Sequence, residues 1–151
     1  MPRPGVRMHE PQIPNYRIVR KLGAGGMGAV FEAVHTKIER RVAIKILYPE
    51  LSANPEVTAR FLNEARAANL VQHTGIVDIY EFGQTEQGIA FIIMEFLKGE
   101  SLRACLRHGP LGLAAVLLFR QIALAVAAAH AKSIVHRDLK PDTEVAEESV
   151  A

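Results

Sequence analysis

The stretch Gly23-Ala24-Gly25-Gly26-Met27-Gly28 sets the fold of the first half of this 151-residue chain. Glycines let the backbone approach phosphate oxygens closely and present N–H donors without side-chain clashes. Segments rich in strand formers lie on both sides, at 16–22 and 29–34, so a strand, a glycine loop and a second strand are predicted. Taken alone, such a loop also fits a dinucleotide-binding fold.

A third strand is predicted over 41–47, Arg-Val-Ala-Ile-Lys-Ile-Leu. Side chains alternate along a strand, so Ala43, Lys45 and Leu47 share one face and Val42, Ile44 and Ile46 the other. A lysine among apolar neighbours needs an anionic partner. The alternative is an edge-strand lysine whose ammonium group reaches solvent.

A helix is predicted from Asn54, its N-cap, to about Leu70. Glu64 lies within the helix's apolar stripe, where a carboxylate is costly unless it is paired, and Lys45 is an available partner. The alternative is an exposed glutamate at the border of the stripe. The stripe consists of residues spaced i, i+4, i+8 and i+11: Val57, Phe61, Ala65 and Ala68.

The rest of the chain predicts two further strands, at 73–83 and 89–96, and then only helices, at 101–107 and 111–132. This order predicts an α+β fold, a small antiparallel sheet with one helix followed by a helical region. Residues 111–129 are nearly all apolar, but Arg120 near their centre would cost roughly 2.5 to 3.5 kcal/mol in a bilayer. A core helix, and no membrane segment, is therefore predicted.

Composition narrows the function further. The net charge is +2 without a long block of one sign, which disfavours a nucleic-acid binder. Cys105 is the single cysteine, so no internal disulfide is expected and a reducing cytoplasm fits. Residues 1–14 contain four prolines and no apolar run, which predicts a flexible leader and not a signal peptide.

The stretch His136-Arg137-Asp138-Leu139-Lys140-Pro141 resembles the catalytic loop of protein kinases. With the glycine loop, Lys45 and Glu64 it gives four motifs in the kinase order, and the chain resembles bacterial serine/threonine kinases. The resemblance implies a protein-kinase-like N-lobe (antiparallel sheet plus one helix) followed by a truncated helical C-lobe. It divides the chain into a leader at 1–14, an N-lobe at 15–94, a hinge at 95–99, a partial C-lobe at 100–142 and a divergent acidic tail at 143–151.

The resemblance also implies roles for individual residues. Asp138 would accept the proton of a substrate hydroxyl, and Lys140 would neutralise charge on the moving phosphoryl group. Lys45, braced by Glu64, would hold the α and β phosphates of ATP. The remaining ATP-binding residues would be the loop glycines Gly23, Gly25 and Gly28, the adenine walls Leu22, Val30 and Ala43, and Met94, Glu95 and Leu97 at the back of the pocket and in the hinge.

The chain departs from the family after Asp142. Thr143 stands where the family has a metal-holding asparagine, and no Asp-Phe-Gly sequence occurs. Both magnesium ligands of the family are thus missing, and no metal site is predicted although the family uses Mg²⁺ with ATP. We expect a truncated kinase that is inactive alone, with ATP and either a protein substrate or a partner kinase as its partners.

Two alternatives remain. A pseudokinase-like module would keep Lys45 and Glu64 to bind nucleotide or a partner kinase. A dinucleotide-binding oxidoreductase would leave Lys45, Glu64 and residues 136–141 unexplained, so it is disfavoured.

Overall fold

The computed structural model describes residues 11–137, 139 and 145–146. It divides into two compact units, which are described separately. One contains Met1–Asn63 and Tyr80–Met94, and the other contains Glu64–Ile79 and Glu95–Ala151. The sequence does not indicate that residues 64–79 group with the second unit.

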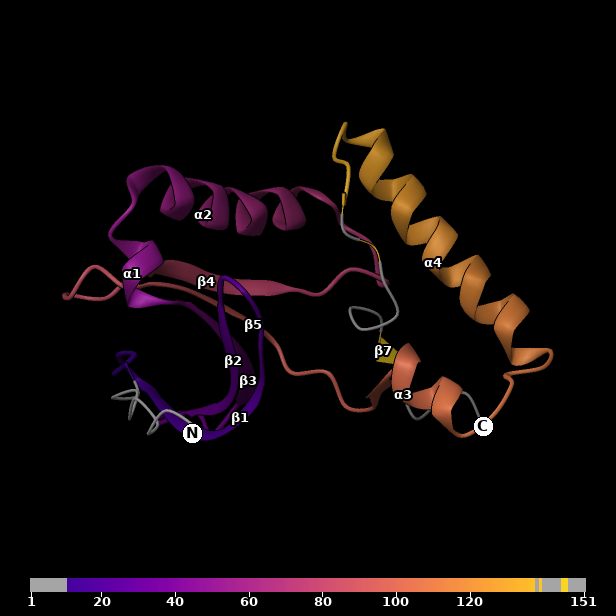
Figure 1. The fold of residues 1–151 in the computed structure, drawn as a ribbon, viewed down its shortest axis with the longest axis horizontal. Coiled ribbons are helices and arrows are strands. Elements are labelled where there is room, and N and C mark those ends of the chain that lie inside the picture. The colour runs from indigo at the N-terminus through magenta and orange to yellow at the C-terminus, as the bar shows by residue number, and fades with distance from the viewer. Residues whose placement is uncertain (1–10, 138, 140–144, 147–151) are drawn as a thin grey trace, which may run out of the picture. The chain divides into compact units, whose positions relative to one another are not determined.

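Strands and helices follow the predicted order, α+β with one long helix among the strands (Figure 1). The elements are β1 Tyr16–Ala24, β2 Gly28–His35, β3 Arg41–Leu47, α1 Pro49–Ser52, α2 Pro55–Leu70, β4 Ile79–Gln84, β5 Ala90–Glu95, β6 Glu100–Ser101, α3 Leu102–Arg107, α4 Ala114–Ala131 and β7 Val145–Ala146.

Most predicted elements are confirmed, and the differences are local. The short helix α1 follows Pro49, where only the end of a strand was predicted. The strand predicted over 73–83 begins only at Ile79, because residues 74–76 form a turn. Asn54 caps α2 as predicted, since its side-chain oxygen accepts the backbone N–H of Glu56 at 3.0 Å.

One five-stranded sheet has the order β1-β2-β3-β5-β4, and the β1–β2 and β2–β3 pairs are antiparallel. Its outer face is the side opposite Lys45 and carries the main hydrophobic cluster, to which β3 contributes Val42, Ile44 and Ile46. Ile13, from the segment before β1, is also buried there. The other side, which we call the inner face, carries Val30, Glu32 and Lys45 by alternation.

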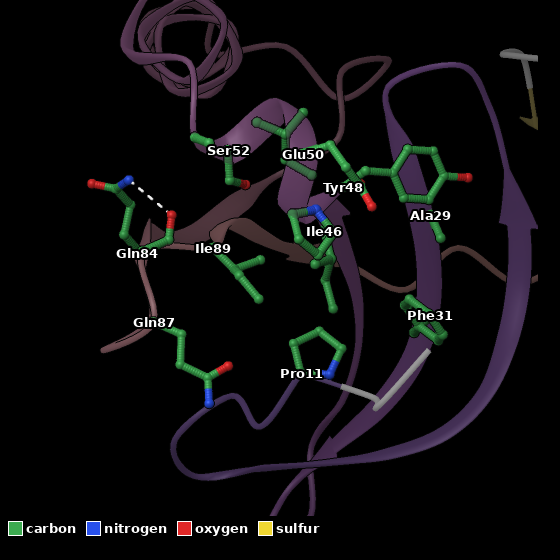
Figure 2. Close-up of a pocket in the computed structure, with 14 residues that line it drawn as sticks. Pro11, Ala29, Phe31, Ile46, Tyr48, Glu50, Ser52, Gln84, Gln87 and Ile89 are labelled. Carbon is green, nitrogen blue, oxygen red and sulfur yellow. Dashed lines mark hydrogen bonds between the residues drawn. The ribbon is translucent and has the colours of Figure 1, made fainter. Parts of the chain in front are cut away.

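A cavity of about 600 Å³ opens on the outer face (Figure 2). Ala29, Phe31 and Ile46 form its buried floor. Residues of α1 and of the β4–β5 hairpin form most of the remaining lining, which Pro11, Leu47, Tyr48 and Ala53 complete. Because the floor residues alternate with Val30 and Lys45, the hollow lies mainly on the side of the sheet away from Lys45.

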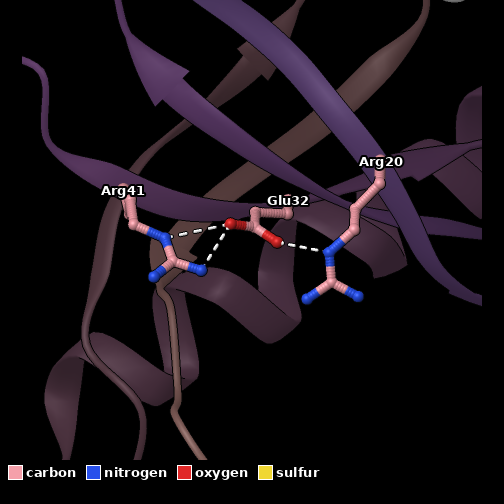
Figure 3. Close-up of polar contacts among 3 residues, drawn as sticks. All are labelled: Arg20, Glu32 and Arg41. Atoms are coloured by element: carbon pink, nitrogen blue, oxygen red, sulfur yellow. Dashed lines mark hydrogen bonds and ion pairs between the residues drawn. The ribbon is translucent and has the colours of Figure 1, made fainter.

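A buried carboxylate ties the first three strands together on the inner face (Figure 3). Glu32 on β2 is 4% exposed, and its two oxygens accept hydrogen bonds from Arg20 on β1 at 2.7 Å and from Arg41 on β3 at 2.9 and 2.5 Å. The hydrogen bond from Arg41, more than that from Arg20, holds the pKa of Glu32 below its ordinary value, against the opposing effect of burial.

Strands β2 and β3 approach unusually closely at Gly28. A Cβ atom on Gly28 would lie 2.1 Å from the carbonyl oxygen of Ile46. The backbone of residue 28 and the carbonyl group of Ile46 cannot move apart without breaking the pairing of Gly28 with Leu47. Glycine is therefore required here for strand packing, independently of any ligand.

In the second unit, Ser101 caps α3 as predicted by accepting the N–H of Ala104 at 3.3 Å. The long helix α4 has no buried residue, and its exposed side chains include Leu113 beside it and Val116, Leu117 and Phe119 within it. By length and composition α4 could span a membrane, with a mean hydropathy of 1.7. The predicted absence of a membrane segment thus stays a prediction.

Replacing Glu32 with glutamine should lower the melting temperature at pH 7 by about 3 to 6 °C, because Arg20 and Arg41 lose their shared anion. A carboxyl whose pKa is lowered by folding stabilises the fold above its unfolded pKa, and this contribution disappears as the pH falls through the folded value. The difference in melting temperature between wild type and Glu32→Gln should therefore narrow below pH 4.5, the ordinary value. Glu86→Gln, in an exposed turn, is the control, and an equal effect there would contradict the assignment.

Gly28→Ala should destabilise the chain by about 2 to 4 kcal/mol, because the new methyl group overlaps the backbone of Ile46. Gly26→Ala is the matched control, since a Cβ there meets no atom within 4 Å, and it should change stability by less than about 0.5 kcal/mol. Urea unfolding of both variants measures the difference. Similar midpoints for the two would show that the close approach does not constrain residue 28.

Candidate functional site

The strand register places three predicted site residues in one row on the sheet. Gly23 on β1 pairs with Val30 on β2, and Val30 pairs in turn with Lys45 on β3. The neighbouring row contains Arg20, Glu32 and Ala43. The glycine loop, an apolar side chain and a cation are therefore adjacent, as the binding of a phosphate-bearing apolar ligand requires.

Lys45 is half-buried, and its Nζ lies 5.6 Å from the centroid of the Phe61 ring. Phe61 on α2 is 1% exposed, so the ammonium group borders an apolar surface. The ring face attracts the cation weakly and cannot neutralise it. An anion placed here would meet a charge that is only partly hydrated, which strengthens its attraction.

The glycines of the loop differ from one another in the space around them. Cβ atoms built on Gly23, Gly25 and Gly26 meet nothing within 4 Å, whereas Gly28 is closed by Ile46. The N–H of Gly25 donates to the carbonyl of Gly28 at 2.9 Å and so closes the turn. The loop therefore has open space beside its first three glycines.

The predicted adenine walls lie on the same strands. Leu22 falls within a register shift between Lys21 and Gly23 and is 40% exposed, while Ala43 is 6% exposed. Val30 is half-buried and pairs with Gly23 on one side and with Lys45 on the other. Leu22 and Val30 therefore offer accessible apolar surface, whereas Ala43 offers little.

The predicted hinge begins at the end of β5. Met94 is half-buried in the first unit, and Glu95 and Leu97 are half-buried in the second. The N–H of Glu95 donates to the carbonyl of Asp78 at 2.9 Å. The backbone N–H of Glu95 is thus engaged within the second unit, and the predicted role of Glu95 in the hinge stays a prediction.

Other predicted residues are not brought into this row. Glu64 is exposed on α2, in the second unit, so its pairing with Lys45 stays a prediction. Asp138, Lys140 and Thr143 lie outside the described residues. Within residues 136–141, Arg137 has a φ of 65°, a left-handed conformation that is uncommon for a side-chain-bearing residue and often occurs at functional sites.

Two contributors were missed from the sequence. Phe61 was assigned to the apolar stripe of a helix. Its contact with Lys45 could not be predicted, because the two residues are far apart in the sequence. Glu32 lies in a strand of apolar residues, on the same face as Val30. A carboxylate in such a strand indicates a buried and paired group, so the sequence did contain a signal for it. In the part of the chain that the structure describes, no three His, Cys, Asp or Glu residues form a metal-binding group.

Comparison of the sequence with known proteins identifies relatives of this chain. The model of the protein kinase domain family matches residues 16–144. The chain is 46% identical over 128 residues to the serine/threonine-protein kinase Pkn1 of Myxococcus xanthus, covering 85% of this chain and 18% of that protein. It is 39% identical over 146 residues to PknA of Mycobacterium tuberculosis, covering 93% and 33%.

A solved structure is similar as well. The kinase domain of Mycobacterium tuberculosis PknI, a double mutant, superposes with a TM-score of 0.76 at 27% identity, covering 90% of this chain and 57% of that one. The chain thus spans only 18 to 33% of the length of the curated relatives above. The family model, these relatives and the row Gly23–Val30–Lys45 agree that this chain belongs to the protein kinase family, as a fragment of the bacterial serine/threonine type.

Proposed function

We propose that the chain binds ATP on the inner face of its sheet, as the nucleotide-binding part of a serine/threonine kinase. The single observation that carries the proposal is the row Gly23–Val30–Lys45, which joins open glycine backbone, an apolar surface and a half-buried cation. Protein kinases use ATP and Mg²⁺, and this row fits the nucleotide.

Each residue then has a defined part in binding. The open space beside Gly23, Gly25 and Gly26 admits the phosphates, and Lys45 neutralises their charge where water is partly excluded. Leu22 and Val30 contact the adenine ring.

Phosphoryl transfer makes further demands. We propose that Asp138 accepts the proton of the substrate hydroxyl and that Lys140 stabilises charge on the phosphoryl group. ATP would supply that group, and Mg²⁺ held by the family's asparagine and aspartate would stabilise the charge on its oxygens. The 151 residues alone offer Thr143 in place of the metal-holding asparagine and contain no Asp-Phe-Gly sequence. We therefore propose that this polypeptide by itself transfers phosphate negligibly.

A second function, that of a pseudokinase-like binding module, is favoured by the exposed apolar side chains of α4. A helix face of this kind suits a protein partner. In either function we place the domain in the cytoplasm, where ATP is available and Cys105 stays reduced.

ATP at about 100 times its dissociation constant should stabilise the full chain by about 2.7 kcal/mol, which raises the melting temperature by about 5 to 10 °C. Lys45→Ala should weaken ATP binding at least about tenfold, because the phosphates lose a charged contact. Lys37→Ala, in the exposed β2–β3 turn, is the matched control and should leave the shift unchanged. An equal shift in Lys45→Ala would refute the assigned role.

Incubation with radiolabelled ATP, Mg²⁺ and a generic protein substrate should give no more labelled product with the 151-residue chain than with Asp138→Asn. The reason is the missing metal ligands, without which the charge of the transition state is largely unopposed. Labelling that disappears in Asp138→Asn would show that the chain transfers phosphate without those ligands and would overturn the proposed inactivity.

A further inference from the structure

We propose that the cavity on the outer face is a second binding site, which takes a small ligand with an apolar ring and a protonated amine, and that its occupation tightens the binding of nucleotide at the glycine loop. The second clause rests on the proposed function, and the first does not. The cavity lies within the first unit and is formed by described residues (Figure 2).

The cavity is distinct from the nucleotide site because it lies on the opposite face of the sheet. Phe31 and Ile46, in its floor, point away from the face that carries Val30 and Lys45. Its volume of about 600 Å³ falls within the range that accommodates small molecules. Ala29, Phe31 and Ile46 are at most 5% exposed, so the floor is a continuous apolar surface that suits a ring.

Polar groups line the rim, and most are already engaged. The side-chain amide of Gln84 donates to the carbonyl of Gly88 at 3.1 Å, and the hydroxyl of Ser52 accepts the N–H of Ala90 at 3.2 Å. Among the described residues that line the cavity, Glu50 alone carries a formal charge, and it is exposed. An apolar floor below a single carboxylate favours an amine on the ligand and disfavours a carboxylate.

Backbone contacts connect this cavity to the glycine loop. Tyr48 lines the cavity, and its N–H donates to the carbonyl of Met27 at 3.0 Å. Leu47 also lines the cavity and is the cross-strand partner of Gly28. Residues 47 and 48 thus hold the C-terminal end of the glycine loop, next to the glycines to which we assign the phosphates. A ligand that packs against Tyr48 favours the loop position in which Met27 and Gly28 are held, which couples the two sites.

The test titrates phenethylamine into the full chain labelled with ¹⁵N, in the absence of ATP. Amide shifts should concentrate at Tyr48, Gly88 and Ile89, with a dissociation constant in the millimolar range or tighter. Phenylacetate, which has the same ring and the opposite charge, should bind several-fold more weakly. Shifts at Val30 and Lys45 in place of those residues, or equal binding of the two probes, would overturn the proposal.

Variants identify the groups responsible. Glu50→Gln should weaken phenethylamine binding about threefold, the scale of an exposed ion pair. Ala53→Trp, at an exposed lining position, should fill the cavity and abolish binding. Glu56→Gln, an exposed acid outside the lining, is the matched control and should have no effect. Unchanged binding in both Glu50→Gln and Ala53→Trp would place the ligand elsewhere.

The coupling between the two sites is tested in a separate experiment, which measures ATP binding with and without phenethylamine. Saturating phenethylamine should tighten ATP binding about threefold in wild type and leave it unchanged in Ala53→Trp. Equal ATP affinity with and without the amine would overturn the coupling. If the chain binds no ATP, the proposed function fails, whereas the amide shifts at Tyr48, Gly88 and Ile89 still decide the cavity site.

Discussion

The antiparallel pairing of β2 with β3 is the constraint on which the rest of the first unit depends. The pairing places Val30 opposite Lys45 and Glu32 opposite Ala43, and so assembles the inner face. The same pairing joins Phe31 to Ile44 in the core of the outer face. Because side chains alternate along a strand, a shift of one residue would exchange the two faces and bury Lys45 in the hydrophobic cluster.

Much of this arrangement could be predicted from the sequence, where periodicity is strong. Residues 41–47 and 55–70 have clear apolar patterns, and their bounds are close to those observed. The four-residue helix α1 is too short to show a period, and Pro49 signals only that the strand ends. The strand expected from 73 began later, because Ile76 and Val77 suggest a strand although Gly75 lies in a turn.

The sequence predicted which residues form the candidate site better than it predicted their contacts with one another. Gly23, Val30 and Lys45 followed from the motifs, and the register then made them neighbours. The two hydrogen-bonding partners of Glu32 are 12 and 9 residues away, beyond the reach of local patterns. Glu64, expected in a buried stripe, is exposed because it lies to one side of the line through Phe61 and Ala65, which are buried.

The close approach of Gly28 to the carbonyl of Ile46 has a consequence for how the hairpin forms. A hairpin shifted by one residue would place Met27 or Ala29 where Gly28 stands, and the Cβ of either residue would overlap the carbonyl oxygen of Ile46. Shifted alignments are thus disfavoured by backbone contact alone, apart from any side-chain packing. Gly28 therefore adds a backbone constraint that agrees with the side-chain pattern, since both favour the alignment that keeps the two faces of the sheet chemically distinct.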